Sequence, residues 1–352
     1  MGLSAILFIG IATAVFVGVN IGGSSTGVAF GPATGSGVLS MRLASGLMAV
    51  FVLLGGLTVG THVVKTLGEG FVPPRYFTPL ASIGVLLFIG LGILLGNVLK
   101  VSVSTSETAV VAVVGMGAAL GVLEWRTVGI VVLWWIVAPI LAFWICAFIG
   151  RYFYDDLVEQ LNLESRESDR IVKLVIIGIG CYMAFSAGAS NTANAVAPLV
   201  GSGQLDMTTG ATLGGLAIGV GAFTLGSRTM ETVGEDITDL SLEASLIVES
   251  IAATIITGLS WAGIPASLAI TTTSCVIGLG WGRASRRIPL RAIVSPDEFT
   301  TASRSAWIED QLELFDPRTT KRVVAAWIAS PTVAGLIAFL AFSIASQFGL
   351  IT

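Results

Sequence analysis

Residues 29–37 read AFGPATGSG, and residues 195–203 read AVAPLVGSG. The two segments share an alanine, a proline and a terminal Gly-Ser-Gly at an offset of 166 residues (195 minus 29). The same offset also matches Gly55 with Gly221. Chance similarity would not stay in phase over so long a stretch, so the chain is predicted to consist of two homologous halves.

Composition assigns both halves to the membrane. The 352 residues are 54% hydrophobic and only 11% charged, whereas soluble domains carry about 25% charged residues. Apolar stretches at 1–19, 128–149 and 323–348 are long enough to cross a bilayer as helices. We therefore predict an all-α, multi-pass protein of the cell membrane, and we exclude a secreted disulfide scaffold, a disordered chain and a nucleic-acid-binding domain.

Few residues are available for metal or cofactor chemistry. The three cysteines have no paired spacing, and His62 is the only histidine. We expect no disulfide, no metal site and no cofactor. The net charge of −4 gives no basic surface for nucleic acid.

Two polar segments divide the chain. The predicted parts are a first transmembrane repeat at 1–150, a polar linker at 151–170, a second repeat at 171–281, an arginine-rich loop at 282–322 and a last transmembrane helix at 323–352. Arginines favour the cytoplasmic side of a membrane, so the arginine-rich loop is predicted to be cytoplasmic.

Each half contains one polar, glycine-rich interruption. Residues 20–32 read NIGGSSTGVAFGP, and residues 188–198 read GASNTANAVAP. Glycine and proline are poor in helix interiors, and irregular backbone at membrane depth faces a wet cavity or is buried in protein. We predict broken helices here, as in many transporters built from repeats. The alternative is that these small residues pack helices closely together.

Hydroxyl and amide groups near the interruptions suggest a binding site. Helix N-termini bind anions through unpaired N–H groups. Such a site suits a small tetrahedral oxyanion, or else a cation held by carbonyl and hydroxyl oxygens. The predicted anion-binding residues are Asn20, Ser24, Ser25, Thr26, Ser104, Thr105, Ser190, Asn191, Asn194 and Ser267.

Charged residues inside apolar segments are costly and usually functional. Glu107 and Glu249 have apolar neighbours on both sides, and Lys65 and Glu231 occupy equivalent repeat positions. We predict these four residues as coupling groups, with Lys65 and Glu231 forming a pair. The alternative is that Lys65 and Glu231 reach the interface from helix ends.

The motifs resemble the inorganic phosphate transporter (PiT) family, which carries G-x-N-D-x-x-N-x-x-x-P in both halves. Gly188, Asn194 and Pro198 match that motif, and residues 226–238 (GSRTMETVGEDIT) are similar to a second family segment. The resemblance implies two inverted repeats with re-entrant hairpins near 102–117 and 267–280.

The departures point to one branch of that family. Where the family has Asn-Asp, this chain has Ser24-Ser25 and Ser190-Asn191. A site without those aspartates suits a fully ionised acceptor such as sulfate better than hydrogen phosphate, which must donate its own proton. The Ser-Thr-Ser-Glu segment ending at Glu107 is similar to the CysP-type sulfate permeases.

These observations predict a secondary transporter, not an enzyme, that imports sulfate or a similar oxyanion by alternating access. No nucleotide-binding loop is present, so a co-transported cation must supply energy. A proton is favoured over sodium because both motif aspartates are absent. Glu107 is the first choice of proton carrier, because burial favours the protonated form of a carboxyl group, and Glu231 is the second. The alternative is a sodium-coupled phosphate transporter. A homodimer is possible, and a channel, receptor or membrane enzyme fits the two polar segments less well.

Overall fold

The structure is a computed structural model that describes residues 3–98, 103–161, 170–226, 241–286 and 317–349. Every regular element in these ranges is helical. In chain order they are α1 (Leu3–Gly35), α2 (Met41–Leu57), α3 (Gly60–Lys65), the π-helical turn η1 (Thr66–Gly70), the short 3-10 helix η2 (Pro74–Tyr76), α4 (Pro79–Val98), α5 (Thr105–Ala119), α6 (Trp125–Tyr152), α7 (Tyr154–Leu161), α8 (Arg170–Gly201), α9 (Met207–Thr224), α11 (Leu242–Trp261), α12 (Leu268–Ser285) and α15 (Pro317–Gln347).

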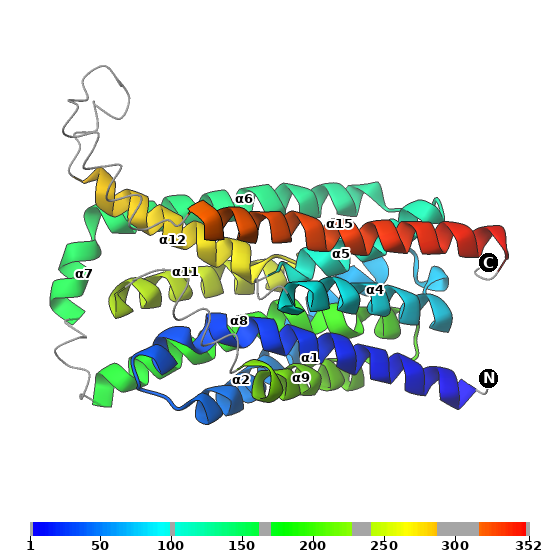
Figure 1. Ribbon diagram of the computed structural model, residues 1–352, viewed down its shortest axis with the longest axis horizontal. Coiled ribbons are helices and arrows are strands. Elements are labelled where there is room, and N and C mark those ends of the chain that lie inside the picture. Colours follow the sequence, from blue (N-terminus) through cyan, green and yellow to red (C-terminus); the bar gives the residue numbers. More distant parts are fainter. Residues whose placement is uncertain (1–2, 99–102, 162–169, 227–240, 287–316, 350–352) are drawn as a thin grey trace, which may run out of the picture.

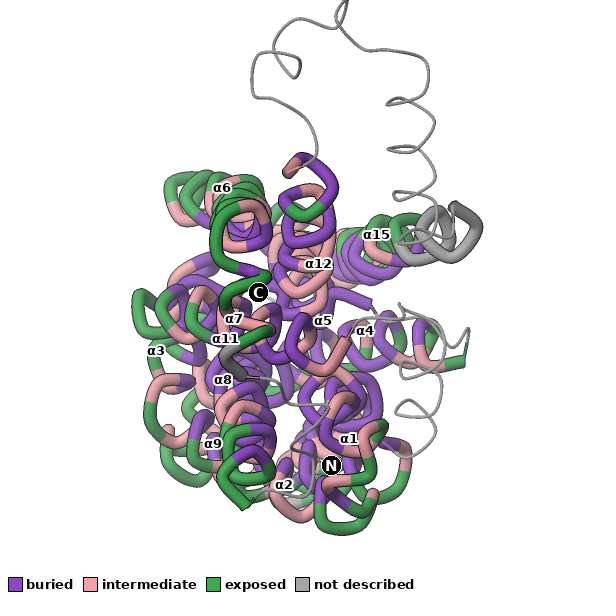
Figure 2. Tube along the Cα trace, turned by 90° about the vertical axis from the view of Figure 1, so that its left-hand side faces the viewer, coloured by how far each residue is buried: buried purple, intermediate pink, exposed green. Residues whose placement is uncertain are grey.

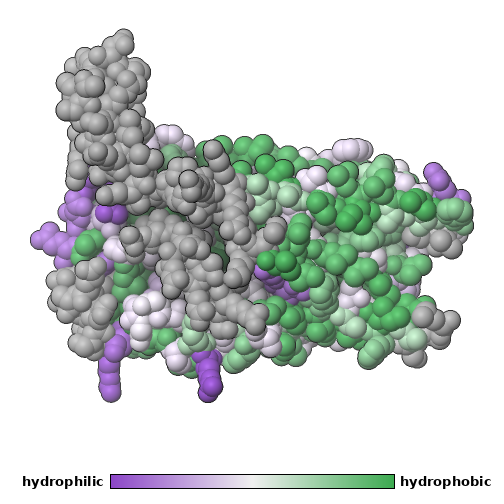
Figure 3. Space-filling model, in the orientation of Figure 1, coloured by the Kyte–Doolittle hydropathy of each residue, from purple (hydrophilic) through white to green (hydrophobic). Residues whose placement is uncertain are grey.

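The architecture is that of a membrane protein. Seven helices of the described residues are long and apolar enough to cross a bilayer, or eight if one bent pair is a single span. The long helices run along the longest axis of the molecule (Figure 1). Apolar residues cover much of the surface around them, and hydrophilic residues gather at one end (Figure 3). The prediction of an all-α, multi-pass fold is confirmed.

Burial changes from the inside of the bundle to the outside. An end-on view shows buried segments in the centre and exposed segments on the outer sides of helices such as α6 and α3 (Figure 2). Many exposed side chains are large and apolar, for example Leu133, Ile136 and Trp144 on α6. Apolar side chains turned outward are what a lipid environment requires of a spanning helix.

The helices are not broken at the positions predicted from the sequence. Helices α1 and α8 run without interruption through 20–32 and 188–198, with Pro32 and Pro198 in their last turns. A proline so close to the end removes only one of the helix's last hydrogen bonds. The span that is broken joins α2 to α3 and η1, with a bend of 61°.

The glycines of α1 and α8 serve close packing instead. A Cβ atom on Gly188 would overlap the carbonyl oxygen of Val52, and one on Gly55 would overlap that of Phe185, so α2 and α8 touch backbone to backbone. The equivalent contact joins α1 to α9, where Gly22 meets the carbonyl of Ile218. The alternative of close packing was thus the right one for these glycines.

Substitution of Gly188 by alanine is expected to lower the free energy of unfolding by about 1–3 kcal/mol, because the added methyl group overpacks a backbone contact. A thermal melt in detergent measures this effect. The matched control is Gly178→Ala on the same helix, where nothing lies within 4 Å of an added Cβ. Equal melting temperatures for the two variants would contradict the packing role of Gly188.

The last helix of each half packs against the other half. A Cβ on Gly115 of α5 would overlap the carbonyl of Gly335 on α15, and one on Gly278 of α12 would overlap that of Phe143 on α6. Gly115 and Gly278 are equivalent at the predicted offset of 163 (278 minus 115). Helix α15 therefore stands to α5 as α6 stands to α12, and the inverted orientation of the repeats stays a prediction.

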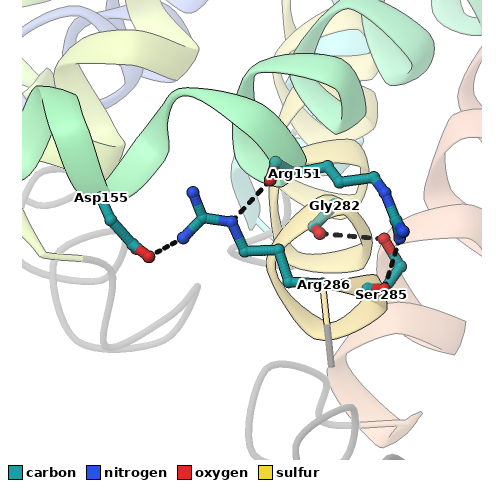
Figure 4. Close-up of polar contacts among 5 residues, drawn as sticks. All are labelled: Arg151, Asp155, Gly282, Ser285 and Arg286. Atoms are coloured by element: carbon teal, nitrogen blue, oxygen red, sulfur yellow. Dashed lines mark hydrogen bonds and ion pairs between the residues drawn. The ribbon is translucent and has the colours of Figure 1, made fainter. Parts of the chain in front are cut away.

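Arginines join α6 and α7 to the end of α12 (Figure 4). The Arg151 guanidinium donates to the carbonyl oxygen of Ser285, and Arg286 Nε donates to the carbonyl oxygen of Arg151 at 2.6 Å. Arg286 also forms an ion pair with Asp155 of α7. Each helix thus has a carbonyl of its last turn bound by an arginine of the other, which fixes α6 beside α12. Within the predicted arginine-rich loop, residues 287–316 lie outside the described part of the chain.

Candidate functional site

A small pocket lies where the N-termini of α5 and α12 approach α1 and α8. It is lined by Ser24, Ser25, Val28, Val103, Thr105, Asn191, Ser267, Leu268 and Ala269. Five of these nine residues, three serines, one threonine and one asparagine, were predicted from the sequence as anion-binding. They come from both halves and from four helices or helix starts, so the fold brings together segments far apart in the chain.

The two helix N-termini at the pocket have the same local structure. Ser104 is the N-cap of α5, and its hydroxyl accepts a hydrogen bond from the Glu107 backbone N–H at 3.3 Å. Ser267 is the N-cap of α12 and accepts from the Ile270 N–H, also at 3.3 Å. The backbone of both N-caps is extended, as capping requires. Two helix dipoles therefore place positive potential at one pocket.

Asn191 of α8 is the centre of a buried hydrogen-bond network. Its Oδ1 atom accepts from the Thr105 hydroxyl at 2.8 Å and from the Ser106 hydroxyl at 3.4 Å. Asn194 Nδ2 donates to the same oxygen at 3.3 Å. These bonds fasten the start of α5 to α8, and they use the oxygen of Asn191 as an acceptor for protein donors.

Ser190 and Asn194 lie behind the pocket lining. Ser190 Oγ donates to the carbonyl oxygen of Ala266 at 2.7 Å and lies 3.2 Å from Ser106 Oγ. Asn194 is fully buried, and its Oδ1 atom has no hydrogen-bond partner among the described residues. These two predicted residues shape the site from the second layer of side chains.

The remaining predicted anion ligands do not line the pocket. Asn20 pairs with Asn97 of α4, whose Nδ2 donates to both Asn20 oxygens at 3.0 Å. Ser104 is the N-cap of α5 and is fully buried. The side chain of Thr26 lies outside what the structure describes.

The predicted coupling groups do not converge. Glu107 is half-buried in the first turn of α5, two residues from Thr105, whereas Glu249 is buried in the middle of α11. Lys65 is exposed at the end of α3. Glu231 lies outside the described residues, so its pairing with Lys65 stays a prediction.

Other residues of the site were not predicted. Val28, Val103, Leu268 and Ala269 add apolar walls to the pocket, and no polarity signal in the sequence marks them. Ser106 joins the network of Asn191 and Asn194. Its signal was present, because Ser106 stands inside the hydroxyl-rich run that contains Thr105 and Glu107.

A known protein family matches most of the chain. The model of the phosphate transporter family matches residues 21–338. The chain belongs to this family. It is 35% identical over 287 residues to the sulfate permease CysP of Bacillus subtilis, covering 80% of this chain and 78% of the relative. It is 26% identical to a putative phosphate permease of Pyrococcus furiosus, covering 80% and 88% of the two chains.

A solved structure supports the fold. The chain superposes on a sodium-dependent phosphate transporter with a TM-score of 0.74 at 19% identity, over 97% of this chain and 99% of the other. Family membership and membrane architecture together make this protein a membrane transporter of inorganic anions. The family and these relatives are transporters rather than enzymes.

Proposed function

We propose that the protein imports sulfate together with protons, by alternating access of its two halves around the pocket between α5 and α12. The observation that carries this proposal is the chemistry of the pocket lining. It offers hydroxyl groups, one amide and two helix N-termini, and none of its nine lining residues is acidic.

That lining suits a dianion without a proton of its own. Sulfate accepts hydrogen bonds from N–H groups of helix starts and from hydroxyl groups with a free proton. Thr105 and Ser24 already donate their hydroxyl protons to Asn191 and Ile21, so the hydroxyl donors to the anion would be Ser25 and Ser267. Hydrogen phosphate would also have to donate its proton, and the one carboxamide oxygen at the pocket already accepts from Thr105 and Ser106. Apart from hydroxyl groups, which are donors and acceptors at once, no acceptor of the lining side chains stays free. The similarity to a sulfate permease supports the same substrate.

Proton coupling is proposed through Glu107. An ionised carboxylate in the first turn of α5 offsets the positive end of that helix and repels an incoming anion. Protonation removes that charge, so proton binding favours anion binding and the reverse. Because the coupling is reciprocal, anion and proton would enter and leave the site together.

Transport into proteoliposomes tests the proposal. Purified protein is reconstituted, and uptake of radiolabelled sulfate is measured under an imposed proton gradient or, separately, a sodium gradient. Proton-driven accumulation that excess phosphate does not inhibit is the expected result. Sodium-driven accumulation that phosphate blocks would overturn the proposal and favour the phosphate branch of the family.

Sodium-coupled phosphate transport is the second candidate, and one observation favours it. The oxygen Asn194 Oδ1 is buried without a hydrogen-bond partner among the described residues, while Nδ2 of the same side chain donates to Asn191 Oδ1 and Ser106 Oγ. A buried amide oxygen with no partner is the kind of ligand that hard cations bind. The same proteoliposome assay decides between the two candidates.

A further inference from the structure

Two helices that do not line the pocket pack against the two whose N-termini do. None of the nine lining residues comes from α6 or α15. Yet α6 meets α12 backbone to backbone at Gly278, and α15 meets α5 in the same way at Gly115. Both outer helices lie above α12 and α5 in Figure 1. Each helix N-terminus at the pocket therefore belongs to a helix that is supported by a helix of the other half.

Trp135 of α6 binds the segment immediately before α12. Its indole N–H donates to the carbonyl oxygen of Pro265 at 2.9 Å. Ser190 of α8 donates its hydroxyl to the next carbonyl oxygen, that of Ala266, at 2.7 Å. Ser267 follows directly and is the N-cap of α12. These two hydrogen bonds therefore fix the direction in which α12 begins.

That direction matters for an anion in the pocket. Leu268 and Ala269 are the first two residues of α12, and both line the pocket. The first N–H groups of a helix have no acceptor within the helix, and they are the groups that bind an anion. A hydrogen bond weakens steeply as its angle departs from linear, so a small rotation of the start of α12 lowers the affinity. Trp135 thus acts on the anion without touching it.

Ser330 of α15 has a corresponding place beside α5. Its hydroxyl donates to the carbonyl oxygen of Gly92 on α4 at 2.8 Å, and its oxygen lies 3.0 Å from Thr108 Oγ1. Thr108 Oγ1 in turn donates to the carbonyl oxygen of Ser104, the N-cap of α5, at 2.7 Å. All three hydroxyl-bearing residues are buried. Loss of one of these bonds therefore leaves a buried polar group unpaired.

The repeat relation places both residues at the same level of equivalent helices. Gly115 and Gly278 are equivalent, and they meet Gly335 of α15 and Phe143 of α6, which relates the two outer helices by an offset of 192 (335 minus 143). At that offset Ser330 is equivalent to position 138 (330 minus 192). Position 138 lies within one turn of Trp135. Different side chains therefore hold the two helix starts from the same place in the fold.

We propose that α6 and α15 position the two helix N-termini of the pocket, with Trp135 acting on α12 and Ser330 acting on α5, and that both residues thereby set the affinity for the anion. Neither residue lines the pocket, so each is a positioning residue. The inference rests on anion binding at this pocket, as proposed above, but not on which anion or which coupling ion is transported.

Equilibrium binding to the purified full-length protein tests the inference. Radiolabelled sulfate and radiolabelled phosphate are titrated separately in detergent, and each titration gives a Kd and a number of sites per protein. A helix N-terminus that is misdirected raises the Kd. A general loss of folded structure lowers the number of sites and the melting temperature instead, so these readouts separate positioning from a merely structural role.

Each variant removes one hydrogen-bonding group. Trp135→Phe keeps an aromatic ring but lacks the N–H, and it is expected to raise the Kd about 2- to 10-fold, the range that one hydrogen bond supplies. Ser330→Ala is expected to raise the Kd within the same range. The two changes act on different helix starts, so their factors should multiply in the double variant. Trp135→Phe combined with Ser190→Ala acts on one helix start, and there the factors should not multiply.

Both outer helices offer a matched control. Trp134→Phe changes the neighbouring tryptophan of α6, to which no carbonyl of 265–266 is bound among the described residues. Ser343→Ala changes a serine of α15 that lies 13 residues (343 minus 330) beyond Ser330, which is about 20 Å along a helix. Both controls should leave the Kd within about 2-fold of the unmodified protein.

Two outcomes would overturn the positioning role. The first is an equal change of the Kd in the Trp135→Phe and Trp134→Phe proteins. The second is an unchanged Kd, with fewer sites and a lower melting temperature, in the Trp135→Phe and Ser330→Ala proteins. If Trp135→Phe does not fold, Ser190→Ala removes the other hydrogen bond before α12 and must itself raise the Kd.

The binding experiment is independent of the uptake assay. A Kd for phosphate that rises in both variants, in a protein that does not bind sulfate, would retain the positioning role and reject the sulfate proposal. Proton-driven sulfate uptake by the unmodified protein, with an unchanged Kd in every variant, would retain the proposed function and reject the positioning role.

Discussion

Replacement of Glu107 by glutamine is expected to reduce proton-driven sulfate accumulation at least 10-fold. Exchange of external for internal sulfate is expected to continue. Glutamine keeps the size of the side chain but cannot release or bind a proton in the transport cycle. Exchange needs only the return of the loaded site and no net proton movement. Uptake and exchange measured in the same proteoliposome preparation separate the two steps.

A structural role for Glu107 predicts a different result. Ser104 and Glu107 have the spacing of a capping box, in which a glutamate at the third helical position stabilises the helix start. Loss of a cap lowers stability and would reduce uptake and exchange alike. The matched control is Glu69→Gln, an exposed carboxyl group of η1, which should change neither. Full proton-driven uptake by the Glu107→Gln protein would show that Glu107 is not the proton carrier.

The convergence of the pocket residues was predictable only in part. Ser24, Ser25, Thr105, Asn191 and Ser267 stand out in the sequence because hydroxyl and amide groups are conspicuous between apolar residues. Their equivalence between repeats indicated one shared site. Sequence spacing could not show which polar side chains line the pocket and which face another helix, because that depends on how the helices pack.

Asn20 illustrates that limit. It opens the same polar run as Ser24 and Ser25, yet it faces Asn97 of α4. The pairing depends on how α1 crosses α4, which no local pattern encodes. The apolar walls at Val28 and Leu268 were unpredictable for the same reason, since a pocket residue of this kind looks like any other core residue.

Glycine was ambiguous from sequence alone. The same residue interrupts a helix or lets two helices approach closely, and only the presence of a partner decides. At Gly22 and Gly188 the partner is a backbone carbonyl on a neighbouring helix. This close contact exists only in the folded protein, between helices that are distant in the sequence. It offsets the low helix propensity of glycine, and a prediction from local sequence cannot include it.

Substitution of Asn191 by aspartate is expected to exchange the anion preference of the pocket. Position 191 is where the family resemblance places an aspartate, and Asn191 lines the pocket. A carboxylate about 5 Å from the anion costs about 3 kcal/mol per unit of anion charge at an effective dielectric constant near 20, so the KM for sulfate should rise about 100-fold or more. Competition assays with unlabelled phosphate measure the accompanying change in preference.

Hydrogen phosphate should lose less than sulfate in the Asn191→Asp protein. Its proton can be donated to the new carboxylate, and a hydrogen bond to a charged group returns about 1.5–3 kcal/mol, or about 10-fold or more in relative affinity. Asn191→Leu is the matched control, because it removes the amide without adding charge and should weaken both anions alike. If leucine and aspartate change the phosphate-to-sulfate ratio equally, the missing carboxylate does not determine selectivity. Ser25→Asp, the equivalent change in the first half, then distinguishes the two halves. A shift of the ratio by Ser25→Asp alone would assign the discrimination to α1, whose Ser24 and Ser25 line the same pocket.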